Sequence, residues 1–259
     1  MTETIIISRD GAIATVVLNR PKKLNALTRD MWSYLGEAMT DLSVDDEIRC
    51  VVLRGAGGKA FAPGNDISEF ETERFDPVSA KSYGAVMHRT LAVLRDCRHP
   101  TVALIEGICV GGGLEIASLC DIRICGTSSR FGVPVNRLGL VMAHAELDGL
   151  LRLVGPAIAS EIVLEGRVFD AVEAKDKGLV TRVVADNEVE VEAYAAAHRI
   201  ADGAPLVARW HKQFLRRLAD PRPLAEAESD EGFACFGTED FATGYRAFLA
   251  KTKPEFKGR

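Results

Sequence analysis

The chain has 259 residues, of which 47% are hydrophobic and 27% are charged, and its formal net charge is −5. This composition is typical of a globular protein with a sizeable buried core. The acidic balance argues against nucleic-acid binding, which needs a concentrated basic face, and no apolar run approaches the ~20 residues that span a bilayer. We therefore expect neither a nucleic-acid partner nor a membrane partner.

The first ten residues show none of the features of a secretory signal. They lack a basic start, a following apolar stretch and a small-residue cleavage site. The six cysteines are scattered and form no CxxC pair, which favours buried, reduced thiols over disulfides or a zinc site. These features predict a cytoplasmic protein without a metal site.

Turn signals and apolar periodicity predict alternating strands and helices in the first half of the chain. The Asp10-Gly11 pair separates two β-branched runs and predicts a hairpin turn. Thr28 precedes apolar residues at helical spacing and is a suitable N-cap. The expected elements are strands over 5–8, 13–18 and 48–53, a helix after Thr28, and a second helix over the apolar residues 86–94.

Residues 101–115 form the most informative stretch of the sequence. They predict a buried strand that runs through three consecutive glycines, Gly111 to Gly113, into a helix. Glycines allow backbone N–H groups to approach a ligand closely, and a helix N-terminus adds a positive dipole. Glu115 stands in the first turn of this helix. The pattern is typical of a site that stabilises an oxyanion.

Helical patterns dominate after about residue 140. The only clear late strand covers 179–184. The expected helices cover 157–164, 171–177, 189–200, 205–218 and 224–251.

Four segments, in this order and spacing, resemble the crotonase (enoyl-CoA hydratase/isomerase) superfamily. They are residues 19–27, 60–67, 101–115 and 120–134. The resemblance covers nearly the whole chain. It implies an α/β fold, a crotonase-like spiral of repeated ββα units over residues 1–195, and a helical oligomerisation segment over residues 196–259 that builds homotrimers or hexamers.

The same resemblance implies an acyl-CoA site and roles for individual residues. The backbone amides of Asn65 and Gly112 would form an oxyanion hole for a thioester enolate, and Glu115 would move protons. The coenzyme A thioester is the substrate, and no further cofactor is implied. The expected substrate-binding residues are Lys23, Leu24, Ala26, Ala62, Asp66, Ile67 and Val135.

The sequence departs from the hydratase pattern at the second catalytic glutamate. Val135 occupies that position and can neither accept nor donate a proton. Residues 142–148 replace a glycine-rich stretch and bring in His144, Glu146 and Asp148. Glu146, ahead of His144, is the predicted substitute because a carboxyl group in a partly desolvated pocket suits acid–base work. The acidic residues also fit the first turn of a helix.

Three functions are compatible with these residues. The nominal one is hydration of a 2-enoyl-CoA to a 3-hydroxyacyl-CoA. The second is enoyl-CoA isomerisation or acyl-CoA hydrolysis with the help of residues 144–148. The third is a non-catalytic oligomer that binds CoA esters, which the absence of the second glutamate would permit.

Overall fold

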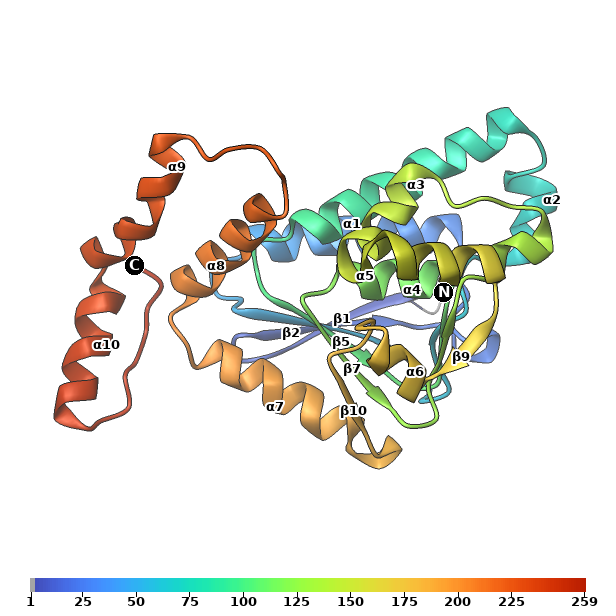
Figure 1. Ribbon diagram of the computed structural model, residues 1–259. Helices are drawn as coiled ribbons and strands as arrows, with labels where there is room; N and C mark the ends of the chain where they lie inside the picture. Colours follow the sequence, from blue (N-terminus) through green and yellow to red (C-terminus); the bar gives the residue numbers. More distant parts are fainter. Residues whose placement is uncertain (1–2) are drawn as a thin grey trace.

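The computed structural model, which describes residues 3–259, builds most of the chain around a six-stranded sheet (Figure 1). In spatial order its strands are β1 (Ile5–Asp10), β2 (Ile13–Leu18), β3 (Cys50–Gly55), β5 (Thr101–Ile105), β7 (Ile122–Gly126) and β10 (Arg182–Val184). β1 and β2 form the predicted antiparallel hairpin, and the later neighbours are parallel. Gly11 at the hairpin turn has a φ of 55°, which glycine adopts without strain.

A smaller, four-stranded sheet alternates with the main sheet along the chain. Its strands are β4 (Ala60–Ala62), β6 (Ile108–Val110), β8 (Arg130–Gly132) and β9 (Val168–Asp170). β3 leads to β4, β5 to β6 and β7 to β8, and helical segments follow each pair. Each turn of the chain therefore adds one strand to each sheet. This repeated strand–strand–helix unit is the spiral that the resemblance implied.

Helices cover both faces of the main sheet (Figure 1). One face carries α1 (Arg29–Val44), α3 (Pro77–Asp96), α4 (Gly112–Leu119) and α5 (His144–Glu165), and the other carries α7 (Val189–Ala201). Two shorter helices are α2 (Phe70–Glu73) and α6 (Ala171–Asp176). Thr28 caps α1 as predicted, because its Oγ1 accepts a hydrogen bond from the Met31 amide. Within residues 3–259, none of the helices is long and apolar enough to cross a membrane.

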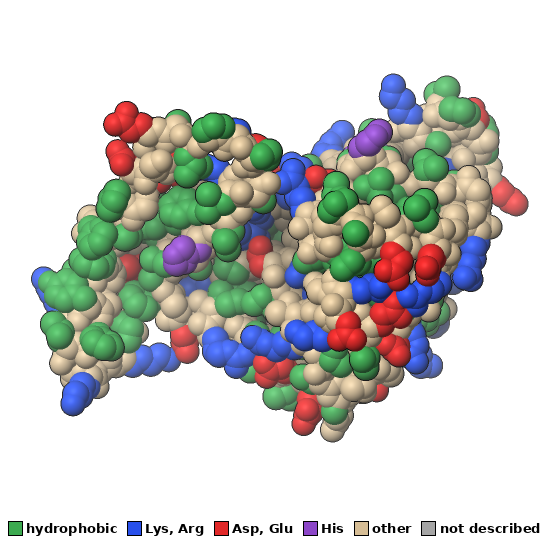
Figure 2. Space-filling view, viewed as in Figure 1, with side chains coloured by type: hydrophobic (Ala, Val, Ile, Leu, Met, Phe, Trp, Pro, Cys, Tyr) green, Lys and Arg blue, Asp and Glu red, His purple; other side chains and the backbone are tan. Residues whose placement is uncertain are grey.

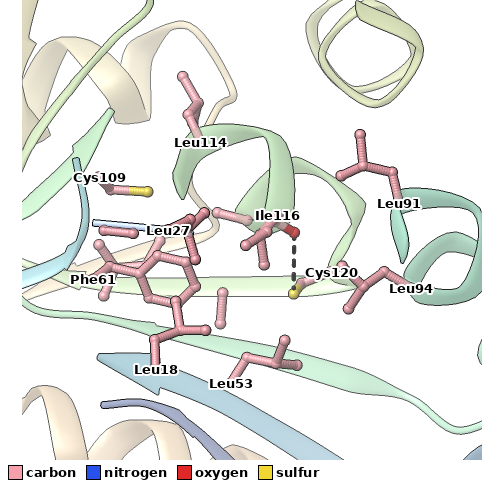
Figure 3. Close-up of a cluster of buried hydrophobic side chains, with 14 of the residues drawn as sticks. Leu18, Leu27, Leu53, Phe61, Leu91, Leu94, Cys109, Leu114, Ile116 and Cys120 are labelled. Carbon is pink, nitrogen blue, oxygen red and sulfur yellow. Dashed lines mark hydrogen bonds between the residues drawn. The ribbon is translucent and has the colours of Figure 1, made fainter. Parts of the chain in front are cut away.

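The strands of the main sheet divide their side chains between two apolar cores. On β3, Val51 and Leu53 belong to the larger core beneath α1, α3 and α4, whereas Val52 packs toward α7. This alternation follows from the period of two along a strand. Figure 3 shows Leu114 and Ile116 of α4 inside the larger core. Because α4 is enclosed on all sides, its N-terminus is held rigidly against the sheets.

The cysteines follow the sequence-based prediction. All six are free, and five are buried, while Cys235 is half-buried. Burial raises the pKa of Cys50, Cys120 and Cys125 to about 12, because the apolar interior disfavours a thiolate. These thiols serve as small core side chains.

The fifth helix joins two segments that the sequence predicted separately. α5 runs from His144 to Glu165, but Gly155 interrupts it with a φ of 74°, and Pro156 begins the second part. Proline is favoured in the first turn of a helix and cannot continue one from the preceding turn. The predicted helix over 157–164 is therefore the second half of α5.

The C-terminal helices extend away from the body (Figure 1). α8 (Pro205–Leu218) has the predicted bounds. The single helix predicted over 224–251 is wrong, because the chain instead forms α9 (Glu226–Asp230), a 3₁₀ segment (Glu231–Gly237) and α10 (Glu239–Ala250). Gly232 and Gly237 weaken helix continuity, and Thr238 starts a new helix by capping α10. The domain boundary at residue 195 stays a prediction, and that residue lies inside α7.

The first testable prediction concerns the close packing of α4 on β4. A Cβ at Gly113 would collide with the Ala62 backbone carbonyl, which is part of β4 and cannot move aside. We expect Gly113→Ala to lower the free energy of unfolding by about 1–3 kcal/mol, as overpacked cores do. Urea denaturation measures the change.

The matched control is Gly232→Ala, where a Cβ would meet no atom within 4 Å. That variant should stay within about 0.5 kcal/mol of the wild type. Equal stability of the two variants would contradict the assigned contact between α4 and β4.

Candidate active site

Two segments predicted to bind substrate lie side by side. The Leu27 amide donates to the Gly64 carbonyl, and the Asp66 amide donates to the Leu27 carbonyl, each over 2.8 Å. In this parallel bridge the hydrogen bonds are made by the Gly64 carbonyl and the Asp66 amide, which precede and follow Asn65. The Asn65 amide therefore takes no part in the bridge. The amide is thus left available to another acceptor.

The second predicted donor lies close to the first. Gly112 begins α4, so its amide has no partner within the helix. A Cβ placed on Gly64 would be 3.2 Å from the Gly112 nitrogen, which shows that the two backbones are in contact there. Gly64 has a φ of 108°, which only glycine adopts easily. The loop at Gly64 therefore packs against the N-terminus of α4, and an oxyanion hole formed by the Asn65 and Gly112 amides stays a prediction.

The Asn65 side chain anchors this loop rather than facing a ligand. Its Oδ1 accepts a hydrogen bond of 2.7 Å from Nε1 of the buried Trp32, and its Nδ2 contacts Sδ of Met87 at 3.6 Å. The anchors come from α1 and α3. They fix the orientation of the backbone amide, and sequence reasoning did not foresee them.

Glu115 is a buried carboxyl on α4. The residue is 6% exposed, and among residues 3–259 its Oε2 finds no hydrogen-bond partner. Burial raises the pKa of Glu115 well above its ordinary value of 4.5, the negative charge of Glu146 raises it further, and the positive charge of Arg74 opposes both. Burial therefore favours the protonated form of Glu115, and its Oε2 is free to contact a ligand.

Glu146 points into the body from the first turn of α5. Its Oε2 accepts a hydrogen bond of 3.0 Å from the Ala143 amide, and its Oε1 lies 3.0 Å from Nε2 of His88 on α3. The side chain is 10% exposed. Two buried carboxyl groups, from the packed helices α4 and α5, thus lie near one another in the interior.

The other two titratable residues of the 142–148 segment lie outside this pair, and Asp148 is half-buried between Arg95 and Arg152. His144 is the first residue of α5 and is exposed. Asp148 accepts a hydrogen bond of 2.8 Å from Arg152, one helical turn further on. Of the residues that replaced the glycine-rich stretch, Glu146 is the one whose charge acts on Glu115.

Val135 forms part of an apolar wall. It lies in a short 3₁₀ helix (Pro134–Leu138), is half-buried, and packs against the larger core. The position that holds a glutamate in hydratases is therefore closed to proton transfer. Any second acid–base group must come from elsewhere, and the structure offers Glu146.

The remaining candidate substrate-binding residues line an edge formed by the two bridged segments. Lys23, Leu24 and Ile67 are exposed, whereas Ala62 is buried in β4. Arg20, which the sequence did not single out, holds the edge together because it bonds both to Asp66 over 2.9 Å and to the Ala26 carbonyl. Binding of coenzyme A along this edge stays a prediction.

Two further residues near the carboxyl pair were missed. His88 lies on the inward face of α3, one helical turn after Gly84. A polar residue among the apolar residues of that face was the signal in the sequence that could have identified it. Arg74 stacks on the rings of Phe70 and Tyr83, with its guanidinium carbon 4.8 Å from each ring centroid. Nothing in the local sequence indicated that Arg74 acts on Glu115.

The fold defines the class of the protein, a spiral of strand–strand–helix units with two buried carboxyl groups, Glu115 and Glu146, on the packed helices α4 and α5. The model of the enoyl-CoA hydratase/isomerase family matches residues 8–259. A probable enoyl-CoA hydratase of Mycobacterium tuberculosis is 35% identical over 260 residues, which cover 99% of each chain. The short-chain-enoyl-CoA hydratase of Clostridium acetobutylicum is 34% identical over 98% of each chain.

Solved structures agree with these relatives. A crystal structure of an enoyl-CoA hydratase/carnithine racemase from Magnetospirillum magneticum is 52% identical, with a TM-score of 0.98, and the match covers 100% of this chain and 97% of that chain. A family protein from Hyphomonas neptunium is 34% identical, with a TM-score of 0.94 over 100% and 99% of the chains. This chain belongs to the enoyl-CoA hydratase/isomerase family.

The second testable prediction concerns the stability cost of burying Glu115. Above pH 4.5 the unfolded chain loses this proton while the folded chain keeps it, so the folded state binds more protons and loses stability as the pH rises. The free energy of unfolding falls by about 1.4 kcal/mol per pH unit, from the pKa of Glu115 in the unfolded chain up to its raised pKa in the folded chain. Glu115→Gln removes the titration, so its stability relative to wild type should increase with pH.

Urea unfolding of both proteins at several pH values from 4.5 to neutrality tests this prediction. The exposed Glu37 on α1 supplies a matched control, since Glu37→Gln should show no such slope. A difference between Glu115→Gln and wild type that stays constant with pH would contradict the raised pKa.

Proposed function

We propose that this protein hydrates a 2-enoyl-CoA to a 3-hydroxyacyl-CoA, with Glu115 and Glu146 as the acid–base pair. The observation that carries the proposal is the placement of two buried carboxyl groups on the packed helices α4 and α5, near enough for the charge of Glu146 to raise the pKa of Glu115. Glu115 also lies three residues after Gly112, whose amide is one of the two available donors. Glu146 thereby takes the role of the glutamate that Val135 replaces.

The two amides supply the electrostatic part of the mechanism. Addition of water to the double bond develops negative charge on the thioester oxygen, and the Asn65 and Gly112 amides would hold that oxygen. Donors fixed in a dry site need no reorganisation, and each contributes about 3–4 kcal/mol to the transition state. The anchoring of Asn65 by Trp32 keeps the first donor in place.

The two carboxyl groups divide the proton transfers between them. Ionised Glu146 takes a proton from water as the water oxygen bonds to C3, and neutral Glu115 delivers its proton to C2. The enolate collapses, leaving Glu146 protonated and Glu115 ionised. The pair returns to its starting state when Glu146 gives up its proton and Glu115 takes one up, so the cycle closes without a net change of charge. Two nearby carboxyl groups that share one proton suit this exchange.

Isomerisation of a 3-enoyl-CoA to a 2-enoyl-CoA is the second candidate, and the apolar environment of Val135 favours it. Isomerisation needs only one carboxylate, which removes a proton from C2 and returns one to C4. Glu146 approaches from a different helix than the missing glutamate would, and can serve this role with the same oxyanion hole. Product analysis with both enoyl-CoA isomers separates the two reactions.

The third testable prediction concerns the two glutamates. Glu115→Gln and Glu146→Gln should each lower kcat by roughly 10²–10⁴, the contribution of a general acid or base. Hydration is followed by the loss of ultraviolet absorbance of the conjugated thioester. Glu37→Gln serves again as the control and should keep the wild-type rate.

Each alternative function predicts a different result in the same assay. If Glu146→Gln keeps the wild-type rate while Glu115→Gln is inactive, the enzyme uses a single glutamate. Release of free coenzyme A would indicate hydrolysis. Tight acyl-CoA binding without any product would indicate the non-catalytic binder.

We propose coenzyme A thioesters as the substrates, no further cofactor, and a cytoplasmic location. The proposed steps are proton transfers that the chain's own groups can perform, which supports the absence of a cofactor.

We also propose that the C-terminal helices assemble the protein into trimers or hexamers. Large apolar side chains gather on this part of the surface (Figure 2), and Phe248 is 83% and Leu249 75% exposed. A cavity of about 1010 Å³ lies between the body and α8, where Figure 2 shows a hollow. Apolar patches of this kind mark protein–protein contacts. A second and third copy of the chain would cover them.

The fourth testable prediction follows from these exposed side chains. Light scattering should give three or six times the chain mass of 28.1 kDa. Phe248→Asp should shift the assembly toward the monomer, because it places a charge in the proposed interface. The control is Phe75→Asp, which changes a residue that is also exposed but lies near α2. A wild-type monomer at all concentrations would contradict the proposal.

A further inference from the structure

The contact between His88 and Glu146 is not explained by the mechanism above. Hydration requires only that protons move among water, Glu146, Glu115 and the substrate. The structure nevertheless places an imidazole against the carboxylate, with 3.0 Å between His88 Nε2 and Glu146 Oε1. His88 reaches this position from α3, whereas Glu146 belongs to α5.

His88 differs from the other partner of Glu146 in what it can carry. The Ala143 amide holds Oε2 but cannot release a proton. An imidazole can take a proton on one nitrogen and release another from its second nitrogen. Among residues 3–259, His88 is the only titratable side chain that hydrogen-bonds Glu146.

The exposure of the three side chains increases in one direction. Glu115 is enclosed, with the residue only 6% exposed, and the Glu146 side chain is 10% exposed. The His88 side chain is 34% exposed and therefore meets solvent. The order Glu115, Glu146, His88 thus leads from the interior of the enzyme to water.

We propose that His88 relays protons between Glu146 and solvent and is the exit for a proton that Glu115 takes from C2 of the substrate. This inference rests on the proposed function. His88 acts through Glu146, so it is a positioning and relay residue rather than one that touches the substrate.

The transfers balance in protons and charge. During dehydration the C2 proton passes to Glu115, the C3–O bond breaks, and Glu146 protonates the departing oxygen to form water. The proton on Glu115 then moves to Glu146 and on to His88 Nε2, while the other ring nitrogen of His88 releases a proton to water. The reverse transfer brings in a solvent proton and restores the pair.

A double-label experiment measures this exit directly. The enzyme is incubated with the equilibrium mixture of crotonyl-CoA and 3-hydroxybutyryl-CoA in water that carries both deuterium and oxygen-18. Oxygen-18 at C3 counts the hydration events, and deuterium at C2 counts the protons that escaped. If the C2 proton stays on Glu115 it returns to the substrate, so deuterium uptake falls behind oxygen-18 uptake.

The test compares two substitutions that separate relay from positioning. His88→Gln keeps a hydrogen-bond donor for Glu146 but cannot relay a proton, and His88→Phe removes both functions. In the wild type, deuterium uptake should keep pace with oxygen-18 uptake. In both variants the ratio of deuterium to oxygen-18 should fall by roughly tenfold or more, within the range lost with a general acid–base group. Free imidazole should partly restore the ratio in His88→Gln.

The control is His198→Gln, which changes an exposed histidine in the last turn of α7 and should keep the wild-type ratio. A wild-type ratio in His88→Gln would overturn the relay, and a loss of rate confined to His88→Phe would then show that the imidazole only orients Glu146. Failure of the wild type to take up oxygen-18 would refute hydration instead. Deuterium uptake alone, compared between wild type and His88→Gln, would still decide the relay.

Discussion

The site depends on the contact between the loop at Gly64 and the N-terminus of α4. Two backbones meet there with no room for side chains, since a Cβ on Gly64 would lie 3.2 Å from the Gly112 nitrogen. This contact brings an amide from each segment to one point and starts the helix that carries Glu115. Burial of α4 between the sheets and α3 makes the arrangement rigid, because a packed interior does not deform continuously.

The same burial determines the chemistry of the carboxyl groups. A charge is costly in an apolar interior, so burial raises the pKa of Glu115, and the neighbouring charge of Glu146 raises it further. Glu146 instead contacts a backbone amide and an imidazole. Two residues of one chemical type thereby have different surroundings.

Val135 lies in the short segment after β8, and the second buried carboxyl group near Glu115 comes from Glu146 in the first turn of α5. Under the proposed function, the carboxyl pair is kept and its second member approaches from another element. Two backbone donors serve any reaction that passes through a thioester enolate. The position of the second carboxyl group then decides which carbon atoms exchange protons.

The sequence by itself determined the alternation of strands and helices and the glycine run that starts α4, because alternating apolar residues and turn signals are local patterns. The resemblance added the spiral, and the roles of the two amides and of Glu115 stay predictions. Tertiary structure decided what depended on distant segments. Helical periodicity did not show that Gly232 and Gly237 divide the C-terminal helix, and the sequence placed Glu146 only marginally ahead of His144. Only the packing of α3 against α5 turned Glu146 inward and placed His88 beside it, since such contacts join residues 58 positions apart in the chain.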